Sequence, residues 1–319
     1  MAEVESRVNT FIRDTLINGE PSRIECLEVF GQTYAISQGA VTTVHLEDEW
    51  FDDVRAPRPV IATLKEGPVH ADIFTFWQRL PNTEPLFEFY HEWDSIAALP
   101  VTTLDHWWNK QIRPVTRNLI RKAQKKGVEV RETTFDDDFV RGMTDIFNEA
   151  PVRQGRRFWH YGKDFETVKQ QFSRYLFREH LLGAYHEDEL IGFIMLADAG
   201  TYGSLGQIIS KLRHRDKSPT NALVAKAVEV CAQKHLPYLV YAHWGDGPLV
   251  DFKRHNGFAE TRLPRYYVPL TRKGQLAIAL GVHGGWKQLI PIQLRAQLKR
   301  LRSRWLSVTT TAGQTSCPE

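Results

Sequence analysis

The order of strand-like and helix-like segments between Val128 and Leu270 constrains the fold more than any other feature of this sequence. Short runs rich in β-branched and aromatic residues alternate there with segments of helical spacing. The strands expected are residues 128–131, 180–186, 190–197, 202–211, 238–244 and 258–270, and the helices expected are 136–149, 165–177, 219–235 and 248–255. This β-α-α-β-β-β-α-β-α-β order predicts an α/β fold (α+β in detail) with a mixed sheet and helices on both faces.

The first hundred residues predict a smaller unit of short strands and turns. Strands are expected at residues 25–29, 34–37, 60–64, 86–90 and 96–101, with a short helix at 74–80. Helical spacing then runs from residue 105 to 126 and ends at Gly127, a typical helix C-cap. We therefore expect an N-terminal α/β region (1–104), a main domain with its leading helix (105–270) and a C-terminal segment (271–319).

Composition excludes several classes of protein. The 319 residues are 42% hydrophobic and 25% charged, which is ordinary for a globular chain. No apolar run approaches the roughly 20 residues that span a bilayer, and the acidic start lacks the apolar core of a secretory signal. Cys26, Cys231 and Cys317 are an odd, widely spaced set, which predicts neither a disulfide framework nor a metal site. A cytoplasmic location is expected.

Charge is distributed unevenly along the chain. Residues 1–100 hold 17 acidic and 7 basic side chains, although the whole chain has a net charge of +3. Basic residues gather at 110–131, with Glu129 as the one acid, and at 271–307, with no acid. Such stretches indicate anionic partners such as phosphates, nucleic acid or a membrane surface. Solvated helix faces are the alternative explanation for both.

A loop before the 219–235 helix carries the first of two local signatures. The sequence RDKSPTNAL begins at Arg215, and a helix N-terminus of this kind presents backbone N–H groups to an anion. In this order and spacing the chain resembles the GNAT superfamily, whose R/Q-x-x-G-x-G/A loop cradles the pyrophosphate of coenzyme A. Ser218 and Thr220 stand where that family has glycines. The resemblance implies that the phosphate contacts come from Arg215, Lys217, Ser218, Thr220 and Asn221.

The second signature is DFKRHNGF, residues 251–258. It resembles the closing helix of GNAT proteins and its terminal Gly-Phe, but Lys253 stands where many members have a tyrosine that protonates the leaving thiolate. A Phe-Lys pair before glycine is closer to the Fem-type peptidyltransferases, and RNLIRKAQKKGVEV (117–130) resembles their opening segment. Fem-type proteins carry GNAT units in tandem, so residues 1–104 are interpreted as a partial, degenerate GNAT unit without a recognisable phosphate loop.

The resemblance implies an N-acyltransferase that moves an acyl group from acetyl-CoA or another acyl-CoA to an amine. In GNAT folds the fourth and fifth strands separate and the pantetheine arm of the cofactor fills the gap. Backbone groups of Gln207, Ile208, Ile209 and Ser210 would then line that arm. His243 would lie near the thioester as the base, and Lys253 would bind an anion or donate a proton.

A basic and aromatic loop, residues 151–164, stands where GNAT folds cover the acceptor. Its candidate substrate contacts are Arg153, Gln154, Arg156, Arg157, Trp159, His160 and Tyr161. Guanidinium groups bind carboxylates or phosphates in bidentate geometry, and aromatic rings stack on flat groups. The loop therefore predicts a small-molecule or peptide amine that is anionic or amino-acid-like. Alternatively, the arginines pair with Asp136, Asp137 and Asp138 and the rings belong to the core.

Residues beyond Leu270 are not part of the GNAT pattern. Leu294, Leu298, Leu301 and Trp305 lie on one face of a basic amphipathic helix, which predicts either a peripheral membrane contact or packing on the domain. Two other functions remain open. One is Fem-type transfer from aminoacyl-tRNA, and the other is a non-catalytic GNAT-like protein that binds a ligand. No metal is expected.

Overall fold

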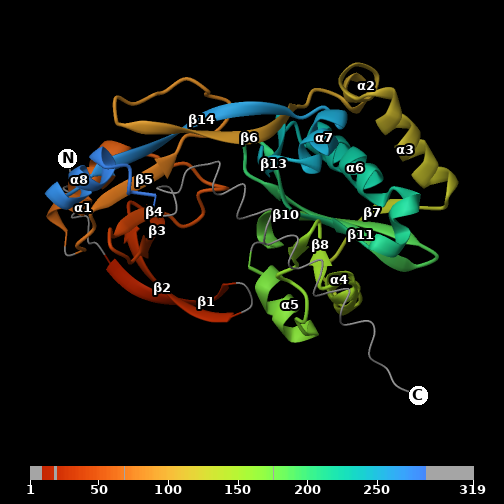
Figure 1. Cartoon of the computed structure of the whole chain (residues 1–319), viewed down its shortest axis with the longest axis horizontal. Coiled ribbons are helices and arrows are strands. Elements are labelled where there is room, and N and C mark those ends of the chain that lie inside the picture. Colours follow the sequence, from red (N-terminus) through yellow and green to blue (C-terminus); the bar gives the residue numbers. More distant parts are fainter. Residues whose placement is uncertain (1–8, 18–19, 68, 175, 285–319) are drawn as a thin grey trace.

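The computed structural model describes residues 9–284 apart from 18, 19, 68 and 175 (Figure 1). One sheet of twelve strands runs through this part of the chain, in the order β1-β2-β3-β4-β5-β14-β6-β13-β12-β11-β10-β7. A short hairpin of β8 (Val152–Arg153) and β9 (Arg156–Arg157) lies outside it. The predicted mixed α/β fold is therefore confirmed. No helix of the described residues is long and apolar enough to cross a membrane.

The C-terminal half of the sheet follows the order expected from the sequence. Its strands are β7 (Glu129–Thr133), β10 (Glu179–His186), β11 (Glu189–Asp198), β12 (Gly203–Ser210) and β13 (Tyr238–His243). Helices α3 (Pro114–Lys125) and α6 (Pro219–Gln233) cover one face, and α4 (Asp137–Asn148) and α5 (Phe165–Phe172) cover the other. Both faces need cover because apolar side chains alternate between them along β10. Leu182 packs under α6, while Leu181 packs under α4.

The N-terminal half repeats this arrangement in a reduced form. Its strands are β1 (Asn9–Ile17), β2 (Glu20–Val29), β3 (Gln32–Ser37), β4 (Thr43–Leu46) and β5 (Ile73–Trp77). As in the other half, an antiparallel meander is followed by a crossover helix, here α1 (Pro57–Glu66), and by a parallel strand. Among the described residues no pair of helices corresponds to α4 and α5. This half therefore has the reduced strand and crossover order expected of a partial GNAT-like unit, and its origin as such a unit stays a prediction.

The two halves exchange a strand with each other. After β5 the chain forms β6 (His91–Pro100), which pairs with β13 of the C-terminal half. After β13 and α7 (Pro248–His255) it forms β14 (Ala259–Pro269), which pairs with β5 of the N-terminal half. The exchanged strands also pair with each other at the centre of the sheet. The sheet therefore runs without interruption across the predicted domain boundary at residue 104.

Three sequence predictions in the first hundred residues are wrong. Residues 60–64 belong to α1, because Pro57 occupies its first turn and Val60, Ile61 and Leu64 point to the core at helical spacing. Residues 74–80 begin in β5, whose five residues are all buried between β4 and β14. Residues 86–90 form a bend without strand pairing.

The leading helix expected at 105–126 is interrupted. The chain forms α2 (Leu104–His106), a π-helical turn η1 (Trp107–Gln111) and then α3, because Pro114 begins a new helix. Short 3₁₀ turns η2 (Leu176–Arg178) and η3 (Leu212–Lys217) and helix α8 (Arg272–Ala279) complete the described elements. The predicted amphipathic helix from Leu294 to Trp305 lies outside the described residues.

Candidate functional site

An opening between β12 and β13 is the centre of the candidate site. The two strands are parallel and pair only at Gly203–Leu239 and Ser204–Val240. Beyond Ser204, β12 continues to Ser210 with β11 alone, while β13 stays with β6. The predicted parallel pairing and separation at one end are confirmed. Gln207, Ile208, Ile209 and Ser210 lie on the part of β12 that has left β13, where the resemblance implies contacts with an extended ligand arm.

The edge of β12 leads through η3 to the start of α6. Ser218 stands at the helix N-cap with φ +56°, the left-handed conformation that favours glycine. Its side chain makes no capping bond, and Thr220 Oγ1 lies 2.9 Å from Ser210 Oγ instead. Two backbone amides of this loop are already used, because Ser218 donates to Arg215 O and Asn221 donates to Ser218 O. A phosphate group bound at this loop would therefore receive its hydrogen bonds mainly from side chains.

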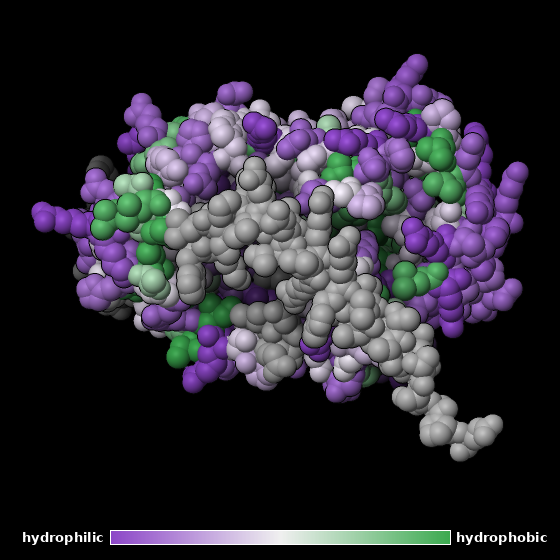
Figure 2. All heavy atoms as spheres, viewed as in Figure 1, coloured by the Kyte–Doolittle hydropathy of each residue, from purple (hydrophilic) through white to green (hydrophobic). Residues whose placement is uncertain are grey.

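Basic side chains surround this loop. Lys126 donates to Asp216 at 2.5 Å, and Lys217 lies 3.9 Å from the same carboxylate. The hydrogen bond from Lys126, and then the nearby charges of Lys217 and Lys122, lower the pKa of Asp216. Arg215 is exposed. Hydrophilic side chains gather over the α3 side of the molecule (Figure 2). Asp216 therefore carries one negative charge among the positive charges of Lys126, Lys217 and Arg215. This excess of positive charge favours an anionic ligand.

His243 and Lys253 occupy different environments at the end of β13. The His243 ring is exposed and packs edge-on against Trp50, with ring centroids 5.3 Å apart. Lys253 is buried; its Nζ donates to the carbonyl oxygens of His243 at 2.5 Å and Trp244 at 3.1 Å. Burial lowers the pKa of Lys253. Its ammonium group fixes the backbone at the mouth of the opening.

The predicted acceptor loop divides into a buried and an exposed set. Arg153 bonds Ile146 O, Ser210 O and Glu149, so it anchors the loop to β12. His160 is stacked on Phe147 at 4.3 Å, and burial, with Lys163 nearby, lowers its pKa to about 3. The residues that remain on the surface are Arg156, Arg157, Trp159 and Tyr161, while Gln154 forms the turn of the β8–β9 hairpin with φ +53°.

Glu179 is a candidate that the sequence reasoning missed. It begins β10 and shares a row across the sheet with Ala197, Ser204 and Val240, which leads to the opening. Its Oε1 lies 3.9 Å from the position a Cβ would take at Gly206, where the register of β12 shifts. Its Oε2 is buried without a hydrogen-bond partner. Burial raises its pKa to about 7, which suits a general base.

Comparisons with known proteins agree with this architecture. No family model matches the chain, and no curated protein matches its sequence. The structure is similar to that of FemX (TM-score 0.57, 10% identity, 85% of this chain and 90% of FemX). It is also similar to the C-terminal domain of a lysylphosphatidylglycerol synthetase from Agrobacterium fabrum (0.52, 10%, 86% and 88%). A third similar structure is L-PGS from Bacillus licheniformis (0.50, 13%, 78% and 85%). These likenesses, with the strand order and the opening between β12 and β13, show that the chain has a GNAT-type fold.

Proposed function

We propose that the protein transfers an acyl group from a phosphate-bearing carrier to an amine in the opening between β12 and β13. The observation that carries this proposal is the end of β12–β13 pairing after Ser204 and Val240. A free strand edge can hydrogen-bond an extended arm, and here it leads to the start of α6, where basic side chains gather.

Acyl-CoA is the donor that fits this geometry first. Its pantetheine arm would lie along Gln207–Ser210, and its phosphates would reach Arg215 and Lys217. The left-handed backbone at Ser218 supports this assignment, because it gives the loop the conformation for which GNAT proteins use glycine.

Aminoacyl-tRNA is a second candidate, favoured by a different observation. The amides of Ser218 and Asn221 donate within their own loop, which weakens a compact pyrophosphate site. The adjoining α3 carries Arg117, Arg121, Lys122 and Lys125, a basic surface longer than one pyrophosphate. One of the similar structures is named as part of a putative lysylphosphatidylglycerol synthetase, and another is named L-PGS.

The chemistry needs few side chains. The amine nitrogen would attack the carbonyl carbon of the acyl-CoA thioester or of the aminoacyl-tRNA ester, and Glu179 would accept the proton that the amine loses, directly or through a water molecule. The C–S bond of the thioester, or the C–O bond of the ester, then breaks, and the leaving thiolate or alkoxide takes up a proton from protonated Glu179 or from water. His243 is the alternative base at the other side of the opening. Lys253 would hold the His243 and Trp244 carbonyls in place during these steps.

The acceptor side is proposed from the exposed half of the loop. Arg156 and Arg157 would meet an anionic group of an amino-acid-like acceptor, with Trp159 and Tyr161 beside them. Arg153 and His160 would shape the loop without touching the acceptor, since their side chains are engaged in the interior.

The direct test is to purify the protein and look for its carrier by native mass spectrometry. The same preparation is then incubated with an amine panel and either acetyl-CoA or aminoacyl-tRNA. Transfer from acetyl-CoA supports the first donor, and transfer from aminoacyl-tRNA alone supports the second. Binding without transfer from either carrier would leave a GNAT-like binding protein and contradict the proposal.

A further inference from the structure

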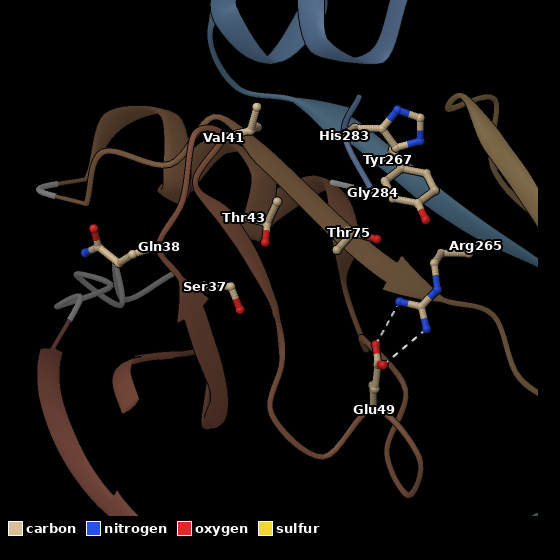
Figure 3. A pocket seen from close by; sticks show the side chains of 10 residues that line it. All are labelled: Ser37, Gln38, Val41, Thr43, Glu49, Thr75, Arg265, Tyr267, His283 and Gly284. Carbon is tan, nitrogen blue, oxygen red and sulfur yellow. Dashed lines mark hydrogen bonds and ion pairs between the residues drawn. The ribbon is translucent and has the colours of Figure 1, made fainter. Parts of the chain in front are cut away.

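A pocket of about 470 Å³ lies on the N-terminal half of the sheet, on the face that carries Trp77 and Val240 (Figure 3). It is open because no helices among the described residues cover this face of the N-terminal half, whereas α4 and α5 cover it in the C-terminal half. The lining comes from β3, β4, β5, β14 and the end of the described chain: Ser37, Gln38, Val41, Thr43, Glu49, Thr75, Arg265, Tyr267, His283 and Gly284. Its volume is that of a small-molecule site.

Two residues that line this pocket carry buried polar atoms without hydrogen bonds. Thr75 is 8% exposed and its Oγ1 has no hydrogen-bond partner. The His283 side chain is fully buried, and neither ring nitrogen has a hydrogen bond, although Nε2 lies 3.0 Å from Glu92 Oε1. In Figure 3 both side chains stand beside Tyr267 around the hollow. Buried groups of this kind normally find partners, so a ligand or ordered water must satisfy them.

Carboxylates dominate the charge of the pocket. Arg265 is its one strong cation, and it is already neutralised: Glu49 accepts two hydrogen bonds from it, at 2.9 and 3.1 Å, and Asp94 accepts one at 2.8 Å. Burial lowers the pKa of Arg265, but these hydrogen bonds outweigh it and raise the pKa. Glu92 adds a third carboxylate behind His283. Burial raises the pKa of Tyr267 to about 12; the charge of Arg265 opposes this shift, and the charges of Glu92, Asp94 and Glu49 add to it.

From this geometry we infer that the pocket binds a small organic ammonium compound. Its cationic group would lie at Glu49, with Thr75 Oγ1 and the hydroxyls of Ser37 and Thr43 as further partners. Glu49 is the carboxylate in the pocket lining, Asp94 also pairs with Arg265, and Glu92 lies behind His283, so these three carboxylates outnumber the one guanidinium and the local charge disfavours an anion. One indole ring, that of Trp77, separates Arg265 from the His243 ring: the Arg265 guanidinium lies 5.4 Å from its centroid and the His243 ring 6.0 Å.

That proximity assigns the bound ammonium compound as the acceptor amine, as an alternative to the amino-acid-like acceptor placed at Arg156 and Arg157, and this last step rests on the proposed acyl transfer. The binding itself does not depend on it. The opening between β12 and β13 and the pocket lie on the same sheet face, with the packed rings of Trp77 and Trp50, 4.7 Å apart, between them. An amine held in the pocket would have to reach past these two rings to present its other end at the opening.

The test uses three five-carbon probes that differ in charge: cadaverine, 1,5-pentanediol and glutarate. Calorimetry on the full chain, without any donor, should show binding of cadaverine, at least tenfold weaker binding of the diol and none of glutarate. Glu49→Gln keeps the size of the side chain and should weaken cadaverine binding at least tenfold. Thr75→Val changes no charge and should weaken it about fivefold, the effect of one neutral hydrogen bond.

Glu260→Gln is the matched control. Glu260 lies on β14, as Arg265 does, but it pairs with Ala97 and so lies on the opposite face of the sheet from the pocket. Equal cadaverine affinity in Glu49→Gln and Glu260→Gln, tighter binding of glutarate, or no binding of cadaverine would each overturn the inference. Cadaverine that binds but is never acylated, by a protein that acylates other amines, would overturn only its assignment as acceptor. A protein that binds cadaverine but transfers no acyl group to any amine would contradict the proposed function and leave the binding inference standing.

Discussion

The ammonium group of Lys253 donates a hydrogen bond to the carbonyl oxygen of His243, at 2.5 Å, and so ties α7 to the end of β13. A second bond reaches Trp244 O at 3.1 Å. Lys253→Met would leave both carbonyls without this partner, at a cost of about 1–3 kcal/mol for each buried group. We expect a Tm lowered by several degrees and a lower kcat, because the backbone beside the opening is no longer fixed.

Thermal melts and steady-state kinetics check this together. Lys234→Met, which changes an exposed lysine at the end of α6, should leave both unchanged. An unchanged Tm with a raised KM in Lys253→Met would mean that the lysine binds an anionic ligand instead.

Glu179 predicts the pH dependence of the reaction. Its base form is the carboxylate, and burial raises its pKa to about 7. The wild-type rate should therefore rise with pH up to about 7 and level off above it. Glu179→Gln should lower kcat by roughly 10²–10⁴ and remove this step from the pH profile. A profile that keeps the same step in the variant would assign it to another group.

The same residue makes an independent prediction for stability. Its folded pKa lies above the ordinary glutamate value of 4.5, so between these values the native state holds a proton that the unfolded state has lost. Wild-type stability should consequently fall as pH rises through this window, relative to Glu179→Gln. Melts of both proteins should coincide near pH 4 and separate by pH 8, with the variant the more stable. A constant difference would show that the carboxyl is not buried in solution.

Arg215 and Lys217 test the donor site. Replacing both with Ala should weaken CoA binding by a few kcal/mol, because each charge-assisted hydrogen bond contributes about 1.5–3 kcal/mol. Arg141→Ala is the control, since Arg141 lies on α4 and pairs there with Asp138. If calorimetry gives equal CoA affinity for the wild type, the double variant and Arg141→Ala, the CoA phosphates do not bind at this loop.

Ser218 offers a test of the loop conformation without a change of charge. A non-glycine residue in the left-handed region costs roughly 1–2 kcal/mol, and Ser218 gains no capping bond in return. Ser218→Gly should raise Tm by about 1–3 °C, after the larger unfolded-state entropy of glycine is subtracted. Ser218→Val should lower Tm. A destabilised glycine variant would show that φ at this position is negative in solution.

Sequence patterns predicted the C-terminal half well because its signals are local. Gly127 ends one element, Asp136 caps α4, and Pro237 separates α6 from β13. The N-terminal half was harder, since Val60–Ile61 and Phe74–Phe76 are short apolar runs that fit a buried helix turn and a buried strand equally. Tertiary packing decided between them: α1 crosses over the sheet, and β5 is enclosed on both edges.

The candidate site was predicted only where backbone position was enough. Strand order alone puts Gln207–Ser210 on the edge of β12 and Ser218 at the start of α6, and their contacts with a ligand stay a prediction. Glu179 looks like any acid before a strand, and its burial depends on Gly206, a neighbour two strands away. The buried states of Lys253 and His160 likewise depend on partners that spacing does not reveal. No sequence signal marked the pocket at Glu49 and Arg265.

The exchange of β6 and β14 has a consequence for how the chain is made. One edge of β5 pairs with β4. Its other edge pairs with β14, which is translated much later and in which Arg265 is the partner of Trp77. At a synthesis rate of about 5–20 residues per second, the ribosome needs on the order of ten seconds or more to deliver that partner. During this time the nascent N-terminal half carries an open, aromatic strand edge, IFTFW. Expressed alone, this half would keep that edge permanently, whereas in the whole chain translation of its last strand closes it.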